Sequence, residues 1–146
     1  MNVKVEIMED IQKPYAVIYT REITEEISAI SRLIENIKQK DFIILQQEER
    51  YIVVKLQDIY MVRLEEKMVA LYGKSEKYYS KLRLYEVEEQ LGSDFMQISK
   101  TTLINRKQIE SVEPSFSGTM YLKLKNQCRD YISRKYLPEL KKYLGL

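Results

Sequence analysis

The chain has 146 residues, of which 45% are hydrophobic and 32% are charged, and its formal net charge is +2. This length fits one domain, or one domain with a small appendage, and the composition excludes a disordered or fibrous chain. With no histidine, one cysteine and four glycines, the sequence offers no imidazole base, no cysteine-rich zinc site and no glycine-rich phosphate loop. We therefore expect no enzyme activity, and we infer no metal, cofactor or small-molecule substrate.

The sequence also lacks the features of an exported or membrane-spanning protein. No apolar run approaches the roughly 20 residues that cross a bilayer, and the N-terminal residues lack the apolar core of a signal peptide. A single cysteine, Cys128, cannot form an internal disulfide. We interpret it as a small apolar filler, with a redox-sensing thiol as the alternative. These features predict a reducing, cytoplasmic location.

The first forty residues are predicted to form a β-β-α appendage. In residues 3–7, valine and isoleucine alternate with Lys4 and Glu6, which is the two-residue period of a half-buried strand. Residues 15–20 are β-branched and aromatic and follow Pro14, which predicts a second strand. From residue 24 to residue 38 the period changes to that of a helix, with Thr24 as its N-cap.

This helix carries an apolar stripe of isoleucines with helical spacing, namely Ile27, Ile30, Ile34 and Ile37. One interpretation is a face that binds a second copy or a partner protein. The other is that the stripe packs on the two strands of its own appendage, as amphipathic helices normally do. Because forty residues bury little surface by themselves, the appendage should lean on the rest of the chain or on a second copy.

Residues 41–146 are predicted to form a second, mainly β domain. Short β-rich runs with turn signals every eight to twelve residues are typical of an antiparallel fold. The predicted strands cover residues 42–46, 51–56, 59–64, 68–72, 77–82, 95–98, 109–112, 120–124 and 128–132. A short helix over residues 84–91 ends at Gly92, and Pro138 is placed to start a terminal helix. The predicted fold class is thus α+β and mainly β.

Acidic pairs occur at positions 48/49, 65/66 and 88/89. Neighbouring residues on a strand or a helix point apart, so the members of a pair cannot share a proton or a metal ion. We interpret these pairs as solvated turns and faces.

Positive charge is concentrated in the last third of the chain. Residues 95–146 contain ten Lys and Arg against four Asp and Glu, a net charge of +6, so the preceding residues carry −4. A basic segment in a nearly neutral chain predicts a polyanionic partner. Within it, Lys100 lies in a predicted turn beside Ser99 and Thr101, and Lys135 follows the last predicted strand together with Ser133 and Arg134.

Several short pieces of this sequence resemble the LytTR DNA-binding family, the output domain of LytR/AlgR-type bacterial response regulators. They are residues 58–60, 78–91, 95–105, 109–112 and 133–137. The resemblance implies a β-rich fold in which loops, rather than a recognition helix, enter DNA. This chain has Gln97 and Ser99 where the family often has Arg and His, and Asn126-Gln127 where the family often has Asn-Gly.

The resemblance also implies residue roles. Lys100 and Lys135 match loop positions that reach bases in successive major grooves, and lysine can donate to guanine O6 and N7. Contacts to the DNA backbone, or support of the loops, are expected of Lys67, Ser99, Thr101, Asn105, Arg106, Ser133 and Arg134.

We therefore expect a sequence-specific transcriptional regulator that binds and bends double-stranded DNA as a homodimer. The forty-residue appendage is too short for a receiver domain, and the resemblance allows control by a membrane-bound regulatory protein instead. The alternative is a protein-interaction module that docks through the isoleucine helix. Its basic face would then meet an acidic partner or a membrane surface.

Overall fold

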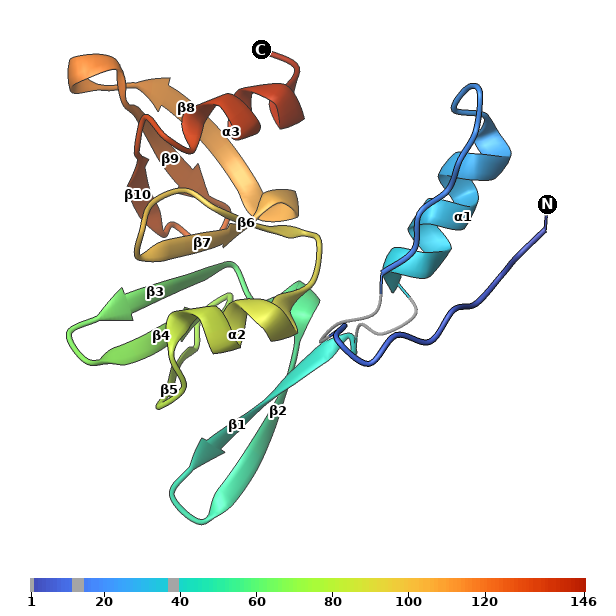
Figure 1. Ribbon diagram of the computed structural model, residues 1–146. Helices are drawn as coiled ribbons and strands as arrows, with labels where there is room; N and C mark the ends of the chain where they lie inside the picture. The colour runs from blue at the N-terminus through green and yellow to red at the C-terminus, as the bar shows by residue number, and fades with distance from the viewer. Residues whose placement is uncertain (1, 12–14, 37–39) are drawn as a thin grey trace. The chain divides into compact units, whose positions relative to one another are not determined.

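The computed structural model describes residues 2–11, 15–36 and 40–146. The chain divides into two compact units, residues 1–38 and residues 39–146. The second unit is rich in antiparallel strands and also holds two short helices (Figure 1). Its elements are β1 (Phe42–Gln47), β2 (Arg50–Lys55), β3 (Met61–Glu65), β4 (Met68–Tyr72), β5 (Lys77–Ser80), α2 (Leu84–Leu91), β6 (Phe95–Gln97), β7 (Thr102–Asn105), β8 (Ile109–Pro114), β9 (Met120–Leu124), β10 (Arg129–Ile132) and α3 (Leu137–Leu144).

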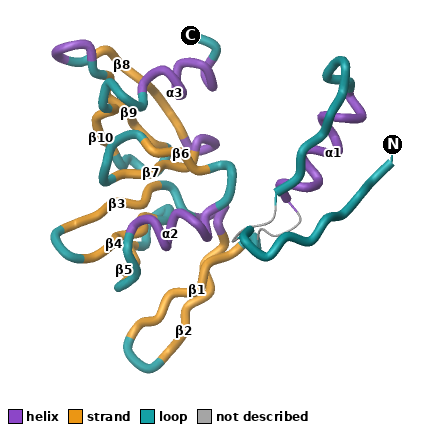
Figure 2. Tube along the Cα trace, viewed as in Figure 1, coloured by secondary structure: helices purple, strands orange, loops and turns teal. Residues whose placement is uncertain are grey.

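The N-terminal unit contains the predicted helix, as α1 (Glu25–Asn36). The side chain of Thr24 accepts a hydrogen bond from the Ile27 amide at 3.3 Å, which confirms the predicted N-cap. The two strands predicted before the helix were wrong, because residues 2–11 and 15–24 form no strand (Figure 2). An alternating pattern makes a strand only where a neighbouring strand supplies its hydrogen bonds. Among the residues described, none does so here.

The isoleucine stripe is only partly covered within this unit. Ile27 and Ile30 are half-buried, whereas Ile34 is exposed. Ile37, the fourth predicted member, lies outside the described residues. Of the described members of the stripe, Ile34 is therefore the most exposed.

A five-stranded antiparallel sheet with the order β5-β4-β3-β7-β6 forms the centre of the second unit. Because side chains alternate along each strand, the sheet has two apolar faces. One face packs with α2 and the β1–β2 hairpin around Val62, Leu71, Leu103 and Val87. The other face packs with α3 and the three-stranded sheet β10-β9-β8. The mainly β, α+β fold predicted from the sequence is therefore confirmed, although β7 was not among the predicted strands.

Tight turns join the strands at the positions that the sequence indicated. Glu48, Glu66 and Gln127 have φ angles of 54°, 53° and 72°. These angles lie in the region that favours glycine. Gln127 therefore holds, without a glycine, the turn that the family often makes with Asn-Gly. Gly92 lies past the end of α2, as predicted, with φ 78° and ψ 179°, so it does not adopt the left-handed helical conformation that commonly closes a helix.

Candidate nucleic-acid interface

Two loops that are far apart in the sequence meet at one end of the central sheet. The loop between β6 and β7 contains Lys100, and the turn between β10 and α3 contains Lys135. The Ser133 amide donates to the Ile98 carbonyl at 2.9 Å, and the Ser133 hydroxyl donates to the same oxygen at 3.4 Å. The two basic loops thus start from adjacent points of the backbone and lie toward the left in Figure 1.

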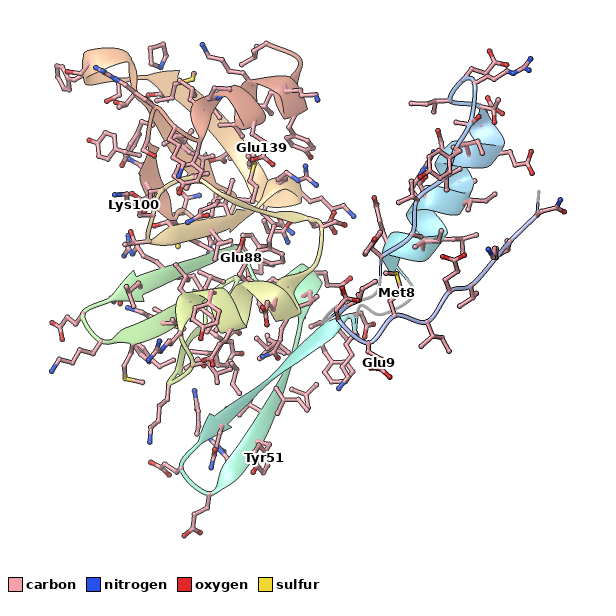
Figure 3. All side chains as sticks on the ribbon, in the orientation of Figure 1. Met8, Glu9, Tyr51, Glu88, Lys100 and Glu139 are labelled. Atoms are coloured by element: carbon pink, nitrogen blue, oxygen red, sulfur yellow. The ribbon has the colours of Figure 1, made fainter. Side chains whose placement is uncertain are left out.

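Hydrogen bonds within the β6–β7 loop hold its shape. The Thr101 amide donates to the Ser99 hydroxyl at 3.2 Å, and the two hydroxyls lie 3.4 Å apart. The Thr101 carbonyl accepts from the Leu64 amide at 2.8 Å, which ties the loop to the end of β3. Ser99 and Thr101 therefore give Lys100 a defined backbone at the end of the sheet, where Figure 3 labels it.

Lys100 and Lys135 are both exposed. Within the described part of the chain, neither forms an ion pair with a carboxylate, and Lys135 Nζ lies 5.4 Å from the ring centre of its neighbour Tyr136. Other lysines of the basic segment are engaged, because Lys107 pairs with Asp94 at 3.2 Å and Lys123 with Glu110 at 2.8 Å. The two predicted base-contacting lysines are thus available to an anionic partner.

Arg134 has a structural contact that the sequence did not reveal. Its Nε donates to the Ser117 carbonyl at 2.6 Å, and its Nη2 donates to the same oxygen. Ser117 belongs to the short 3-10 turn between β8 and β9, residues Phe116–Gly118. The guanidinium is exposed, so it holds this turn beside the Lys135 loop while one edge still faces solvent.

Arg134→Ala should reduce the salt dependence of DNA binding and loosen the 116–118 turn. If the exposed edge of the guanidinium contacts a phosphate, the slope of log K against log salt should fall by about one. The Thr119 amide donates to the Phe116 carbonyl at 3.2 Å within the turn. Its hydrogen exchange should become faster when the turn loosens. Arg134→Lys keeps the charge but not the two-pronged contact, so it should keep the slope while the amide still exchanges faster. An unchanged slope in Arg134→Ala would limit Arg134 to support of the turn.

The structure does not bring Asn105 and Arg106 into this cluster. Phe95 pairs with Asn105 and Gln97 with Leu103, so Asn105 lies at the far end of β7 from Lys100. Its side-chain Nδ2 donates to the Ile59 carbonyl at 3.1 Å, and its side-chain Oδ1 accepts from the Lys107 backbone amide at 3.1 Å. Arg106 donates to the Ser93 carbonyl and lies 4.7 Å from the Tyr143 ring centre. Both residues support the fold at this end.

Lys67 lies in the exposed β3–β4 turn, on the same side as the two loops, because β3 runs alongside Thr101 toward that turn. Glu65 at the base of the turn is not the solvated acid that we expected. It accepts hydrogen bonds from Tyr72, from Arg63 at 2.9 Å and from Lys77 at 2.9 Å. These bonds lower the pKa of the Glu65 carboxyl to about 2, and the hydrogen bond from the Tyr72 hydroxyl has the largest effect. Its negative charge is thus compensated near the candidate interface.

This lowered pKa predicts a pH-dependent stability. A carboxyl whose pKa falls from 4.5 to about 2 on folding adds stability above its unfolded pKa, and that stability is lost as the pH falls through 4.5 toward 2. After allowance for solvent screening we expect about 1 kcal/mol. Urea unfolding between pH 7 and pH 2 should show Glu65→Gln less stable than the natural protein at neutral pH and equal to it near pH 2. Glu66→Gln, an exposed neighbour, is the control, and a constant difference across this range would contradict the prediction.

A second set of contacts joins the central sheet to the three-stranded sheet beneath the interface. The Thr102 hydroxyl donates to Asp130 at 2.9 Å, and Arg63 lies 3.8 Å from the same carboxylate. Sequence analysis missed Arg63, Thr102 and Asp130, because they lie on three strands and share no motif. In the sequence, the threonine directly after the loop was a signal for such a contact.

The arrangement agrees with a match to the LytTr DNA-binding domain family over residues 49–145. The chain belongs to this family. The matched residues include both basic loops and all of the strands from β2 to β10, while β1 and the N-terminal unit lie before them. Membership of the LytTr family is therefore carried by the part of the chain that holds the candidate interface.

Relatives of known sequence include transcriptional regulators. The chain is 30% identical over 103 residues to the sensory transduction protein LytT of Enterococcus faecalis, a match that covers 70% of this chain and 43% of LytT. It is 25% identical over 132 residues to an uncharacterised HTH-type transcriptional regulator of Staphylococcus aureus, and this match covers 90% of each of the two chains. The chain thus spans less than half of LytT but most of the staphylococcal protein.

A solved structure shares the fold of the LytTr domain. It is the LytTr DNA-binding domain of a methyl-accepting/DNA response regulator from Bacillus cereus, with a TM-score of 0.65 and 22% identity. The match covers 73% of this chain and 99% of that domain. None of the helices described here has the length and apolar character needed to cross a membrane. Within the same described residues, no group of three or more His, Cys, Asp or Glu is placed to hold a metal ion.

Proposed function

We propose that this protein is a cytoplasmic transcriptional regulator that binds specific double-stranded DNA sequences as a homodimer. The observation that supports it most is the hydrogen-bonded junction between Ser133 and Ile98, which sets two exposed lysines on adjacent loops of a LytTr domain. Lys100 and Lys135 donate to base edges in the major groove, and Arg134, Thr101 and Lys67 lie closer to phosphates.

The spacing of the loops favours bent DNA if the two lysines enter successive grooves. Each lysine is two residues from the junction, so their Cα atoms lie at most about 20 Å apart. Successive major grooves of straight DNA are about 34 Å apart. A bend toward the protein narrows that gap, and the cost of bending makes binding depend on the stiffness of the sequence between the contacts.

A selection from a random duplex library tests this proposal. The full chain is incubated with the library at two salt concentrations, and bound duplexes are sequenced. We expect a short motif that occurs twice, as paired half-sites, and that survives the higher salt, because base contacts depend less on salt than phosphate contacts do.

Weak binding that lacks a motif and disappears uniformly with salt would overturn the proposal. The basic face would then be electrostatic only, and the alternative of a docking module would replace the regulator. Control by a membrane-bound regulatory protein stays a prediction, and it is addressed by asking which proteins co-purify with the chain after detergent extraction of membranes.

A further inference from the structure

Residues 3–7 form an extended segment whose side chains are divided between two faces. Val3, Val5 and Ile7 are 83%, 82% and 95% exposed. Lys4 and Glu6 share the other face, where their charged groups lie 2.5 Å apart. In the part of the chain that the structure describes, no strand pairs with this segment (Figure 2). It thus presents an unpaired backbone edge and an exposed apolar face.

The order of the charges makes this segment complementary to itself. If two copies lie antiparallel with Val5 opposite Val5, then Lys4 of each copy lies opposite Glu6 of the other, and Val3 lies opposite Ile7. Opposite charges placed directly across an antiparallel pair stabilise it, whereas like charges destabilise it. We propose that residues 3–7 of two copies pair in this register and join the homodimer. This inference deepens the dimer part of the proposed function and is independent of the DNA contacts.

In such a dimer, helix α1 is the element that would cover the apolar face of the ribbon. A two-stranded ribbon alone is at best marginally stable in water. Leu33 and Ile34 of α1 are 62% and 44% exposed, and two copies of the helix bring two such faces. Packing of these faces on the paired valines and isoleucines buries apolar surface that is exposed in the single chain.

Disulfide trapping tests the register. In a full chain carrying Cys128→Ala, Val5→Cys places the two new thiols across the symmetry axis, where the Cα atoms are about 4.5–5.5 Å apart, within the range of a disulfide. Val3→Cys is the matched control, because its two copies are four residues out of register and about 13 Å apart. We expect rapid covalent dimer from Val5→Cys and little from Val3→Cys. Equal yields from the two variants would overturn the proposed register.

Charge reversal tests whether the pairing occurs between chains. Lys4→Glu and Glu6→Lys each place like charges opposite each other twice, so each should weaken dimerisation about five- to thirtyfold. A mixture of the two variants restores both opposite-charge pairs in a heterodimer, so tagged and untagged chains should associate about as tightly as the natural protein. A purely local effect of Lys4 and Glu6 within one chain would leave the mixture as weak as each variant alone, and that result would overturn the proposal.

Binding to a single half-site separates this inference from the proposed function. Both reversal variants keep the second unit intact, so their affinity for one half-site at low protein concentration should be unchanged. If the natural protein forms tight dimers but shows no sequence preference, the proposed strand pairing stands and the proposed DNA function is rejected. If the protein binds specific DNA as a monomer, the DNA function stands and the proposed strand pairing is rejected.

Discussion

Lys135→Ala is expected to lower the preference of the protein for its selected DNA site by about 1–3 kcal/mol, about five- to 150-fold, without lowering its stability. Lys100→Ala should have an effect of the same size at a different base position. Both side chains are exposed at loops whose backbone is held by bonds from Ser133, Ser99 and Thr101. Removing either side chain should therefore take away the proposed DNA contact and little of the fold.

The measurement is competition between the selected duplex and a scrambled one at fixed salt, with a urea midpoint for each variant. Lys141→Ala is the matched control, because Lys141 is an exposed lysine in the last turn of α3, away from both loops. It should change the two affinities equally and slightly. Equal losses on both duplexes for Lys100→Ala and Lys135→Ala would mean that these lysines contact phosphate only.

Asn105→Ala is expected to lower the free energy of unfolding by about 2–4 kcal/mol while leaving sequence preference unchanged. Asn105 is 2% exposed, and the substitution leaves the Ile59 carbonyl and the Lys107 amide without their partner. An unsatisfied polar group in a buried site carries its full desolvation cost. The change acts on the fold because Asn105 lies at the opposite end of β7 from Lys100.

Asn126→Ala provides a control with the same two kinds of bond. Asn126 donates to the Gly73 carbonyl at 2.7 Å and accepts from the Cys128 amide at 3.1 Å, but it is only half-buried. Water can replace its bonds, so we expect a loss of about 1 kcal/mol. A stable Asn105→Ala variant that has lost its sequence preference would instead place Asn105 at the DNA.

Much of the second unit could be predicted from the sequence because its strands obey a local rule. Most of its strands are short runs of β-branched and aromatic residues, and the turns fall at acidic or amide residues such as Glu66 and Gln127. The β7 strand was missed because all four of its residues are buried. Its side chains therefore show no alternation of apolar and polar residues.

The remaining differences arise from contacts that no local pattern contains. Residues 3–7 have the period of a strand, but pairing also needs a partner strand. Arg106 follows the basic loop by only a few residues, yet β7 carries it to the other end of the sheet. The sequence indicated that Glu65 is a solvated turn residue. In the structure its carboxylate accepts hydrogen bonds from Tyr72 and Lys77, which lie on other strands. In each case a long-range neighbour decides the role of the residue.

The most direct test of the central claim is methylation interference on the selected duplex. Methylation of guanine N7 blocks a lysine in the major groove, so partially methylated duplex is bound, separated and cleaved for the natural protein, Lys100→Ala and Lys135→Ala. We predict interference at two guanines in each half-site, one of which becomes insensitive in each variant. Interference that is absent, or identical in all three proteins, would contradict direct base contact by these two lysines.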